Sequence, residues 1–326
     1  LEAVRTLAHT PANLVVLDRN NYHTFLPLLY QVAAAELEAT DITYPVRTIL
    51  RKLPTASFLM AEVKRIDLAG GFVEADGLFM SYDFLIVAAG SVPHFFGVEG
   101  AAEYAFPLYS LSQGIALRSH ILRCFERAVQ DADVTKRQRI LTFAIVGGGP
   151  TGVEFAGALA ELIHGPLGKD YPDLDPREVR IVLLEALDSL LSFLPRKLPT
   201  YTLARLRKMG VDVRLEAMVN QITPQSVHLK DGTVIPTETV AWTAGVRGDP
   251  RVQGWGLPTA RGGRVQVLPT LQVPEHPEVY VVGDLAYLEK DGRPLPMVAW
   301  VAKVQGKAAA HNIARQIAGQ ELKPYR

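Results

Sequence analysis

The stretch FAIVGGGPTGVEFAGALAEL, residues 143–162, constrains the fold more than any other part of the sequence. Apolar residues run into Gly147, Gly149 and Gly152, and hydrophobic residues then recur at helical spacing. In such a strand, turn and helix, the first glycine allows a tight turn and the second lets a pyrophosphate approach the backbone. The third lets the helix pack on the strand, and the helix N-terminus offers free N–H groups. The pattern predicts a parallel α/β unit that binds a dinucleotide; a purely structural glycine turn is the weaker alternative.

An acidic residue closes the next apolar run. The sequence VRIVLLEA, residues 179–186, reads as a buried strand that ends at Glu185. A carboxylate at this strand end accepts hydrogen bonds from both ribose hydroxyls and repels a 2′-phosphate, which favours NADH over NADPH. The interval from Gly147 exceeds the usual spacing of about 20 residues, and the proline-rich loop at 164–180 accounts for the excess. An ordinary surface acid at a strand end is the alternative reading of Glu185.

The sequence repeats one plan in its two halves. Asp76-Gly77 leads to Ala89-Gly90, and Asp231-Gly232 leads to Ala244-Gly245 over the same interval. Each Asp-Gly pair predicts a hairpin turn, and the apolar run after each hairpin predicts a buried strand. Two related nucleotide-binding units are therefore expected.

The start of the chain fits the same repeat. The sequence NLVVLD, residues 13–18, reads as a buried strand whose closing acid, Asp18, matches Glu185. The alignment sets LEAVRTLA beside VEFAGALA, so we expect that a first strand and glycine turn precede Leu1. A second nucleotide, FAD, is then expected beside NADH. Asp284, in the strand-ending sequence VVGDLA, is suited to hold the ribityl chain of a flavin.

Composition excludes several other classes. The 34 basic and 34 acidic residues are balanced, without a long run of one sign, which argues against nucleic acid as a partner. Cys124 is the only cysteine, so a redox-active cysteine pair and a cysteine metal site are excluded. The eight histidines show no metal-binding spacing, so no metal site is expected. No apolar run is long enough for a transmembrane helix, and helices are expected at 1–8, 108–131 and 301–318.

Several segments together resemble type II NADH dehydrogenases. These are single-subunit, rotenone-insensitive NADH:quinone oxidoreductases of the FAD-dependent pyridine nucleotide-disulfide oxidoreductase superfamily. The most specific segment is YHTFLPLLYQVA within residues 18–50; GGGPTGVEFAGALAEL, AWTAGV and VYVVGDLA follow in the expected order. Sulfide:quinone reductases and disulfide reductases are disfavoured because one cysteine cannot form a redox pair.

The resemblance implies an α/β fold of two doubly wound FAD/NAD(P)-binding domains of the disulfide-reductase type, built from a duplicated unit. Residues 1–110 and 245–326 would form the FAD-binding domain, and 111–244 the inserted NADH-binding domain. The implied activity is hydride transfer from NADH to flavin, followed by two-electron reduction of a membrane quinone in a respiratory chain.

The resemblance also assigns candidate site residues. Those expected near FAD are Asp18, Arg19, Val63, Ala89, Gly90, Asp284, Ala299, Val301, Ala302 and Lys307. Those expected at NADH are Gly147, Gly149, Thr151, Gly152, Glu185 and Gly245. Glu154 matches an acid near the nicotinamide–flavin contact and is the catalytic candidate, with a plain first-turn helix acid as the alternative. For Lys307 a solvated helix lysine is an equal alternative, and for His23 a structural role is at least as strong as a cofactor or quinone contact.

The quinone side departs from the family pattern. In AWVAKVQG, residues 299–306, Trp300 and Val304 stand where glutamines are expected, and only Gln305 remains. Tryptophan still offers a surface for stacking on a quinone ring. The departure keeps two alternatives open: a flavin enzyme that reduces a soluble carrier or oxygen, and a redox-sensing module that binds NADH.

The resemblance implies partners as well. The family attaches to the cytoplasmic face of the inner (plasma) membrane as a peripheral protein, through amphipathic helices that would follow ELKPYR. That segment lies outside this sequence, as does the first phosphate loop, so poor FAD binding by the sequence as given is expected. A homodimer is compatible with the fold.

Overall fold

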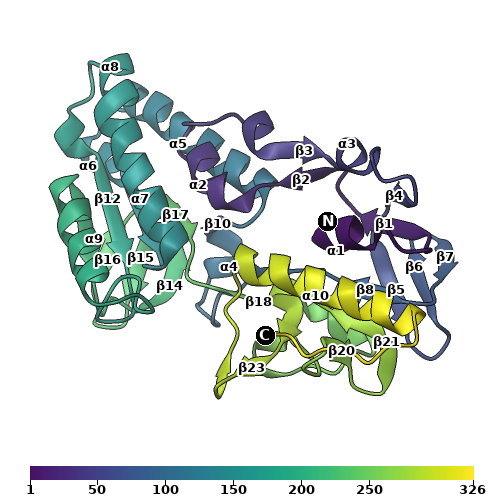
Figure 1. Cartoon of the computed structure of the whole chain (residues 1–326). Coiled ribbons are helices and arrows are strands. Elements are labelled where there is room, and N and C mark those ends of the chain that lie inside the picture. Colours follow the sequence, from purple (N-terminus) through teal and green to yellow (C-terminus); the bar gives the residue numbers. More distant parts are fainter. The chain divides into compact units, whose positions relative to one another are not determined.

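The computed structural model describes residues 1–326, apart from the side chain of Pro176. The chain divides into two compact units (Figure 1). Unit 1 comprises Leu1–His23, Tyr44–Val92 and Val246–Arg326, and unit 2 comprises Thr24–Thr43 and Pro93–Gly245. Residues 24–43 and 93–110, which we expected in the first domain, therefore lie in unit 2.

A five-stranded parallel sheet forms the centre of unit 2, in the order β10-β17-β11-β12-β13. Its strands are β10 (Phe106–Pro107), β11 (Thr142–Val146), β12 (Arg180–Leu184), β13 (Val211–Arg214) and β17 (Thr239–Trp242). The chain runs from β11 to one side through β12 and β13, and returns to the other side of β11 with β17. Ligands of doubly wound sheets bind at such a reversal, beyond the carboxyl ends of the strands. The glycine turn follows β11 at this point.

Alternating side chains of β11 face two different layers. Phe143 and Ile145 pack among the helices, whereas Ala144 and Val146 pack against a three-stranded antiparallel sheet. All four are buried, which explains why this strand reads as continuously apolar. The helices of unit 2 are α2 (Leu29–Ala33), α4 (Ala101–Tyr104), α5 (Leu111–Gln130), α6 (Val134–Ile140), α7 (Pro150–Leu162), α8 (Gly168–Asp170) and α9 (Lys197–Lys208).

The antiparallel sheet of unit 2 confirms the predicted hairpin. It consists of β14 (Val219–Thr223), β15 (Ser226–Leu229) and β16 (Val234–Pro236). Gly232 takes a φ of 88° in the turn between β15 and β16, a conformation that glycine adopts at little cost. The equivalent turn of unit 1, at Asp76-Gly77, joins β6 to β7 with φ values of 45° and 80°.

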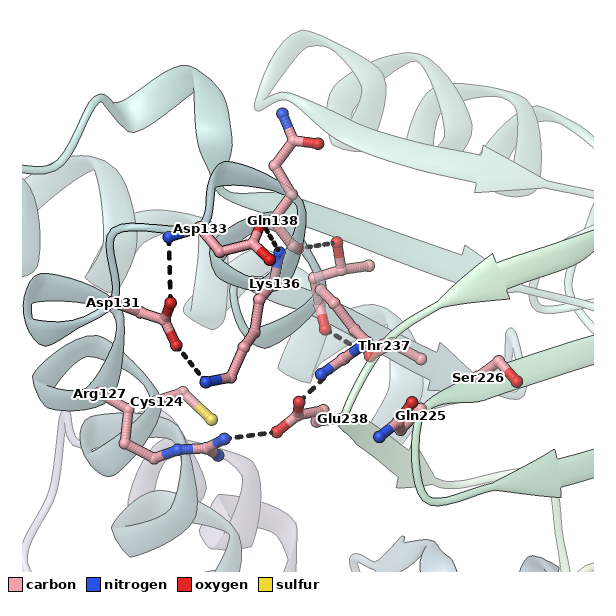
Figure 2. Close-up of polar contacts among 12 residues, drawn as sticks. Cys124, Arg127, Asp131, Asp133, Lys136, Gln138, Gln225, Ser226, Thr237 and Glu238 are labelled. Carbon is pink, nitrogen blue, oxygen red and sulfur yellow. Dashed lines mark hydrogen bonds and ion pairs between the residues drawn. The ribbon is translucent and has the colours of Figure 1, made fainter.

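Charged side chains tie the helical layer of unit 2 to its sheet (Figure 2). Glu238, directly before β17, accepts hydrogen bonds from Arg127 of α5 at 2.8 Å and from Arg139 of α6 at 3.0 Å. Cys124 of α5 is buried, with its sulfur 3.5 Å from His120 Nε2. Helix α5, which corresponds to the helix expected at 108–131, lies within unit 2.

Unit 1 repeats the strand arrangement. An antiparallel sheet of β5, β6 and β7 precedes β8, as β14–β16 precede β17. β1 pairs with β4, and β8 pairs with β21, both in parallel. The strands are β1 (Leu14–Asp18), β4 (Ala56–Met60), β5 (Val63–Asp67), β6 (Phe72–Ala75), β7 (Leu78–Ser81), β8 (Leu85–Val87), β18 (Val246–Gly248), β19 (Val265–Gln266), β20 (Gln272–Val273), β21 (His276–Val281), β22 (Ala286–Tyr287), β23 (Glu289–Lys290) and β24 (Arg293–Pro294).

Strand β1 is less buried than its sequence predicts. Val15 is 55% exposed, and no residue of β1 is fully buried. The ladder found for β1 among the described residues is the one with β4, so one edge of the strand and one face at Val15 stay uncovered. An apolar run alone does not distinguish a central strand from an edge strand.

Helices pack on β21 to form the core of unit 1. Leu7 of α1 and Ile313 of α10 belong to the same buried cluster as Tyr280 of β21, which is fully buried. The helices are α1 (Glu2–Leu7), α3 (Val46–Leu50) and α10 (Ala299–Ile317). The remaining short strands contain the residues at which the chain passes from one unit to the other. They are β2 (Tyr22–Thr24), β3 (Thr43–Pro45) and β9 (Ser91–Pro93). Among the described residues, no helix combines the length and the apolar character needed to cross a membrane.

Candidate functional site

The glycine turn of unit 2 has the geometry of a phosphate-binding loop. A Cβ at Gly147, where φ is 112°, would lie 2.6 Å from the Cα of Ala244, and one at Gly152 would lie 1.9 Å from the carbonyl oxygen of Gly147. A Cβ at Gly149 would meet nothing within 4 Å. Gly147 and Gly152 are therefore required by packing, whereas Gly149 faces open space at the N-terminus of α7. This open backbone is where the close approach of a phosphate is expected.

Glu185 is bound to the turn itself. Its Oε2 accepts a hydrogen bond from the backbone N–H of Gly148 at 2.5 Å, and its Oε1 accepts one from Leu187 at 2.8 Å. Each carboxylate oxygen has a second lone pair, so both can still accept a ribose hydroxyl. The sequence predicts a nucleotide contact for Glu185, and the structure adds that the same carboxylate holds the glycine turn.

A threonine that the sequence did not single out supports the same turn. Thr243, directly after β17, donates its hydroxyl to the carbonyl oxygens of Val146 at 2.9 Å and Gly147 at 3.1 Å. Gly245 follows two residues later, and a Cβ there would lie 3.0 Å from the ring of Phe96. Thr151, in the first turn of α7, is partly exposed. The Ala-Gly pairs of the internal repeat were the signal that could have directed attention to Thr243.

Glu154 and Tyr30 lie near each other in unit 2. Helix α2, which carries Tyr30, packs against α7, which carries Glu154. Desolvation raises the pKa of Glu154, and Tyr30 has its pKa raised by burial and by the Glu154 carboxylate. A carboxyl whose proton is retained to higher pH is suited to proton handling. Tyr30 belongs to the YHTFLPLLYQVA segment but was not predicted as a site residue.

The acid at the end of β1 behaves like its counterpart in unit 2. Asp18 Oδ1 accepts a hydrogen bond from the backbone N–H of Asn20 at 2.8 Å, just as Glu185 binds the backbone two residues later. Arg19 follows Asp18 on the exposed surface, and Val63 is the first residue of β5. Ala89 and Gly90 follow β8, where Gly90 has a φ of 73°.

Asp284 lies in a turn held by neighbouring side chains of unit 1. Its Oδ2 accepts a hydrogen bond from the hydroxyl of Ser91 at 2.8 Å, while no bond to Oδ1 is found among the described residues. Gln305 is fully buried, and its Oε1 accepts a hydrogen bond from the backbone N–H of Gly283 at 2.7 Å. This differs from the expected quinone-facing position, because the Gln305 side chain already supports the turn that carries Asp284.

The N-terminal half of α10 carries the remaining candidates. Trp300 is 70% exposed and Val304 is partly buried, whereas Val301 is buried in unit 1. Ala302 packs on the turn, since a Cβ at Gly283 would lie 3.3 Å from its Cβ. Ala299 is exposed at the start of the helix. Lys307 pairs with Glu2 of α1 at 3.7 Å, so this lysine also links two helices of unit 1.

His23 lines a cavity of about 420 Å³ in unit 1, together with Arg5, Tyr44, Thr48, Ile49, Arg51 and Lys52. Burial lowers the pKa of His23, and the positive charges of the N-terminus and Arg5 act in the same direction. Among the described residues, no group of three or more His, Cys, Asp or Glu side chains is arranged to hold a metal ion.

The sequence matches a known family along almost its entire length. Residues 1–306 match the family described as pyridine nucleotide-disulphide oxidoreductase. Two structures of NDH2 from Plasmodium falciparum share the fold. One, in complex with RYL-552, has a TM-score of 0.83 and 21% identity over 88% of this chain and 61% of that chain. The other, in complex with NADH, has a TM-score of 0.80 and 22% identity over 84% of this chain and 59% of that chain.

Curated relatives define the group more narrowly. A type II NADH:quinone oxidoreductase of Mycobacterium tuberculosis is 38% identical over 98% of this chain and 71% of its own length. A second one from the same organism is 37% identical over 88% of this chain and 64% of its own length. The chain therefore belongs to the pyridine nucleotide-disulphide oxidoreductase family and, within it, to the type II NADH:quinone oxidoreductases. It spans only part of the length of these relatives.

Proposed function

We propose that this protein oxidises NADH through bound FAD and delivers the electrons to a quinone. The observation that carries the proposal is the glycine turn of unit 2. Glu185 binds the N–H of Gly148 there, and Gly149 faces open space at the N-terminus of α7. That arrangement fits a dinucleotide with a free 2′-hydroxyl. Relatives named NADH:quinone oxidoreductases, at 37% and 38% identity, support the same donor and acceptor.

In this proposal unit 2 binds NADH. The pyrophosphate lies on the backbone of Gly147, Gly149 and Thr151, and Gly152 lets α7 approach. Glu185 orients the ribose hydroxyls, and Gly245 leaves space beside the turn. Glu154 positions the nicotinamide or handles protons. Its raised pKa lets the carboxyl keep a proton closer to neutral pH than an ordinary glutamate does.

Unit 1 binds FAD in the same proposal. When bound, FAD supplies the two-electron chemistry between NADH and the acceptor. Asp284 offers its Oδ1 to the ribityl chain, and the first turn of α10, residues 299–302, borders the flavin ring. The adenosine half is contacted by Asp18, Arg19 and Val63, and the pyrophosphate by Ala89 and Gly90. Lys307 offsets negative charge on the cofactor, with Glu2 as its present partner.

The acceptor side is assigned to Trp300 and Val304, while Gln305, the third expected residue, supports the adjoining turn through the N–H of Gly283. The exposed Trp300 ring gives a quinone a surface for stacking, and Val304 adds an apolar contact. The same two residues favour a second candidate function, reduction of a soluble carrier or oxygen, because Val304 has no hydrogen-bond donor for a quinone carbonyl and Trp300 has only its indole N–H.

Replacement of Trp300 and Val304 by glutamine distinguishes a quinone acceptor from a soluble carrier or oxygen. W300Q/V304Q should lower the KM for a short-chain quinone several-fold and leave NADH-driven reduction of a dye unchanged. A matched control, K303Q, changes an exposed residue of the same helix turn. Equal quinone kinetics in the wild type and W300Q/V304Q would assign the acceptor contact to other residues.

The proposal includes the setting of the reaction. A quinone acceptor is dissolved in lipid, so we place the protein at the cytoplasmic face of the inner (plasma) membrane as a peripheral protein, with a homodimer as its assembly. Flotation of the full-length protein with vesicles of anionic lipid, together with light scattering, tests the attachment and the assembly. Failure to float removes the peripheral membrane assignment, and a monomeric mass removes the dimer.

The donor is tested by anaerobic titration of the holoenzyme. NADH should bleach the flavin absorbance at stoichiometric addition, and NADPH should do so at least tenfold more slowly, because Glu185 repels a 2′-phosphate. Equal rates with the two donors, or no reduction by NADH, contradict the proposed donor.

A further inference from the structure

A buried arginine binds the carbonyl groups of the turn that carries Asp284. Arg264 is 5% exposed, and its Nε donates a hydrogen bond to the backbone carbonyl of Asp284 at 3.0 Å. Its Nη2 donates to the carbonyl of Ala286, and its Nη1 donates to the carbonyl of Leu295 at 3.0 Å. One guanidinium thus joins the Asp284 turn to the segment that leads into α10.

The positive charge of Arg264 is stabilised mainly by backbone carbonyl groups. Burial lowers the pKa of Arg264, and the charge of the Asp284 carboxylate opposes this shift. No direct salt bridge is found for Arg264 among the described residues, and the ring of Tyr287 lies 5.6 Å from the guanidinium carbon. Burial of a cation is costly, so three carbonyl dipoles, the face of an aromatic ring and the nearby charge of Asp284 together stabilise it.

The planar fork of arginine suits this task. Its N–H groups point in fixed directions and reach three carbonyls at once, whereas the single ammonium of lysine has no comparable fork. Ser91 and Gln305 fix the Asp284 carboxylate and the Gly283 N–H, but neither contacts the carbonyl side of the turn. Without the guanidinium, the carbonyls of Asp284, Ala286 and Leu295 lose this donor, and the turn loses its link to the segment before α10.

We propose that Arg264 is a positioning residue of the FAD site, which sets the orientation of the Asp284 carboxylate and fixes the segment leading into α10. The inference rests on the proposed function, because it takes Asp284 as the residue that binds the ribityl chain. Arg264 itself contacts only the protein, so its effect on FAD passes through Asp284 and the start of α10.

A double-mutant cycle tests this role through FAD affinity, without NADH or quinone. FAD dissociation constants of the full-length protein are measured for the wild type, R264K, D284N and R264K/D284N. Each single variant should weaken FAD binding by about tenfold, the equivalent of about 1.4 kcal/mol. The double variant should bind FAD about as well as the weaker single variant, because both changes remove the same interaction. R261K is the matched control, since Arg261 is exposed three residues earlier and should leave FAD binding unchanged.

The alternatives give different results. The inference is overturned if the two losses of FAD affinity multiply in the double variant, or if R264K binds FAD normally. Either result leaves the proposed function intact. A wild type that binds no FAD overturns both. If R264K fails to fold, R264Q, whose planar amide keeps two N–H donors, replaces it. If neither variant folds, Arg264 is needed for the folding of unit 1 as a whole, and the positioning role is overturned.

Discussion

The carboxylate of Glu185 and the backbone N–H of Gly148 form a hydrogen bond of 2.5 Å, which joins the end of β12 to the turn after β11. A second hydrogen bond, from Leu187 to the other oxygen, fixes the plane of the carboxylate. The residue that we propose to distinguish the nucleotide thus also supports the glycine turn. Nucleotide choice and loop geometry are therefore expected to change together.

Replacement of Glu185 by glutamine should affect both properties. E185Q removes the negative charge that repels a 2′-phosphate and weakens a charge-assisted hydrogen bond worth about 1.5–3 kcal/mol. We expect the KM for NADH to rise about tenfold and the preference for NADH over NADPH to shrink. Steady-state kinetics with both donors measure this, and D188N, at an exposed position of the same loop, is the control. An unchanged preference in E185Q contradicts the assignment.

The two glycines at the start of α7 should respond differently to alanine. A Cβ at Gly149 meets nothing within 4 Å, so G149A should unfold at the same denaturant concentration as the wild type but bind NADH about tenfold more weakly. A Cβ at Gly152 would clash with the carbonyl of Gly147 at 1.9 Å, so G152A should lose about 1–3 kcal/mol of stability. Urea unfolding and NADH titration separate the two effects, and normal NADH affinity in G149A would argue against phosphate binding at this position.

Glu154 should contribute to the pH dependence of both activity and stability. Desolvation raises its pKa, so the neutral form is favoured in the folded protein, and its contribution to stability is lost as pH rises through the folded pKa. E154Q is neutral at every pH, and we expect it to be more stable than the wild type near pH 7, by less than about 1 kcal/mol because the side chain is solvent-accessible. The difference in stability between E154Q and the wild type should disappear at acidic pH, where Glu154 is protonated in both the folded and the unfolded state. Urea unfolding as a function of pH measures it.

The activity of E154Q gives the second half of this test. The wild-type profile of kcat against pH should contain an ionisation above the usual glutamate range, and E154Q should lack it. E161Q, an exposed glutamate of the same helix, should retain the wild-type profile. Identical profiles for E154Q and the wild type would leave Glu154 as an ordinary helix acid.

Glu238 should have the opposite pH dependence. Burial by itself would raise the pKa of Glu238, but the hydrogen bonds and charges of Arg127 and Arg139 outweigh it and lower the pKa. The ion pairs therefore stabilise unit 2 above the unfolded pKa, and this contribution is lost as pH falls through the folded pKa. E238Q should cost about 2 kcal/mol near pH 7 and progressively less in acid. Urea unfolding across this range measures it; D170N, at an exposed site of unit 2, should stay within about 0.5 kcal/mol of the wild type.

The regular elements near the glycine turn could be predicted from the sequence because local signals agreed there. The apolar run of β11, the spacing of Gly147 and Gly152, and the Asp-Gly hairpins each demand one local geometry. Strand β1 shows the limit of this reasoning. Its composition matches that of β12, but Val15 is 55% exposed because burial depends on neighbouring strands and not on composition.

Side-chain partners could not be predicted in the same way. In GGRVQV, residues 262–267, alternation places Arg264 on the polar face with the exposed Gln266, yet Arg264 is buried under the turn that carries Asp284. Gln305 was expected to face a quinone because of its position in a motif, and it instead binds the N–H of Gly283. Both contacts join segments separated by about 20 residues, and spacing along the sequence contains no information about them.

The most direct test of the central claim is steady-state turnover of the full-length holoenzyme with NADH and a short-chain quinone, in competition with oxygen and a soluble electron carrier. The account predicts fast quinone reduction with NADH, at least tenfold slower turnover with NADPH, and minor electron flow to oxygen or the carrier. Rapid reduction of the flavin by NADH without turnover on any quinone would contradict the assignment of quinone as the acceptor.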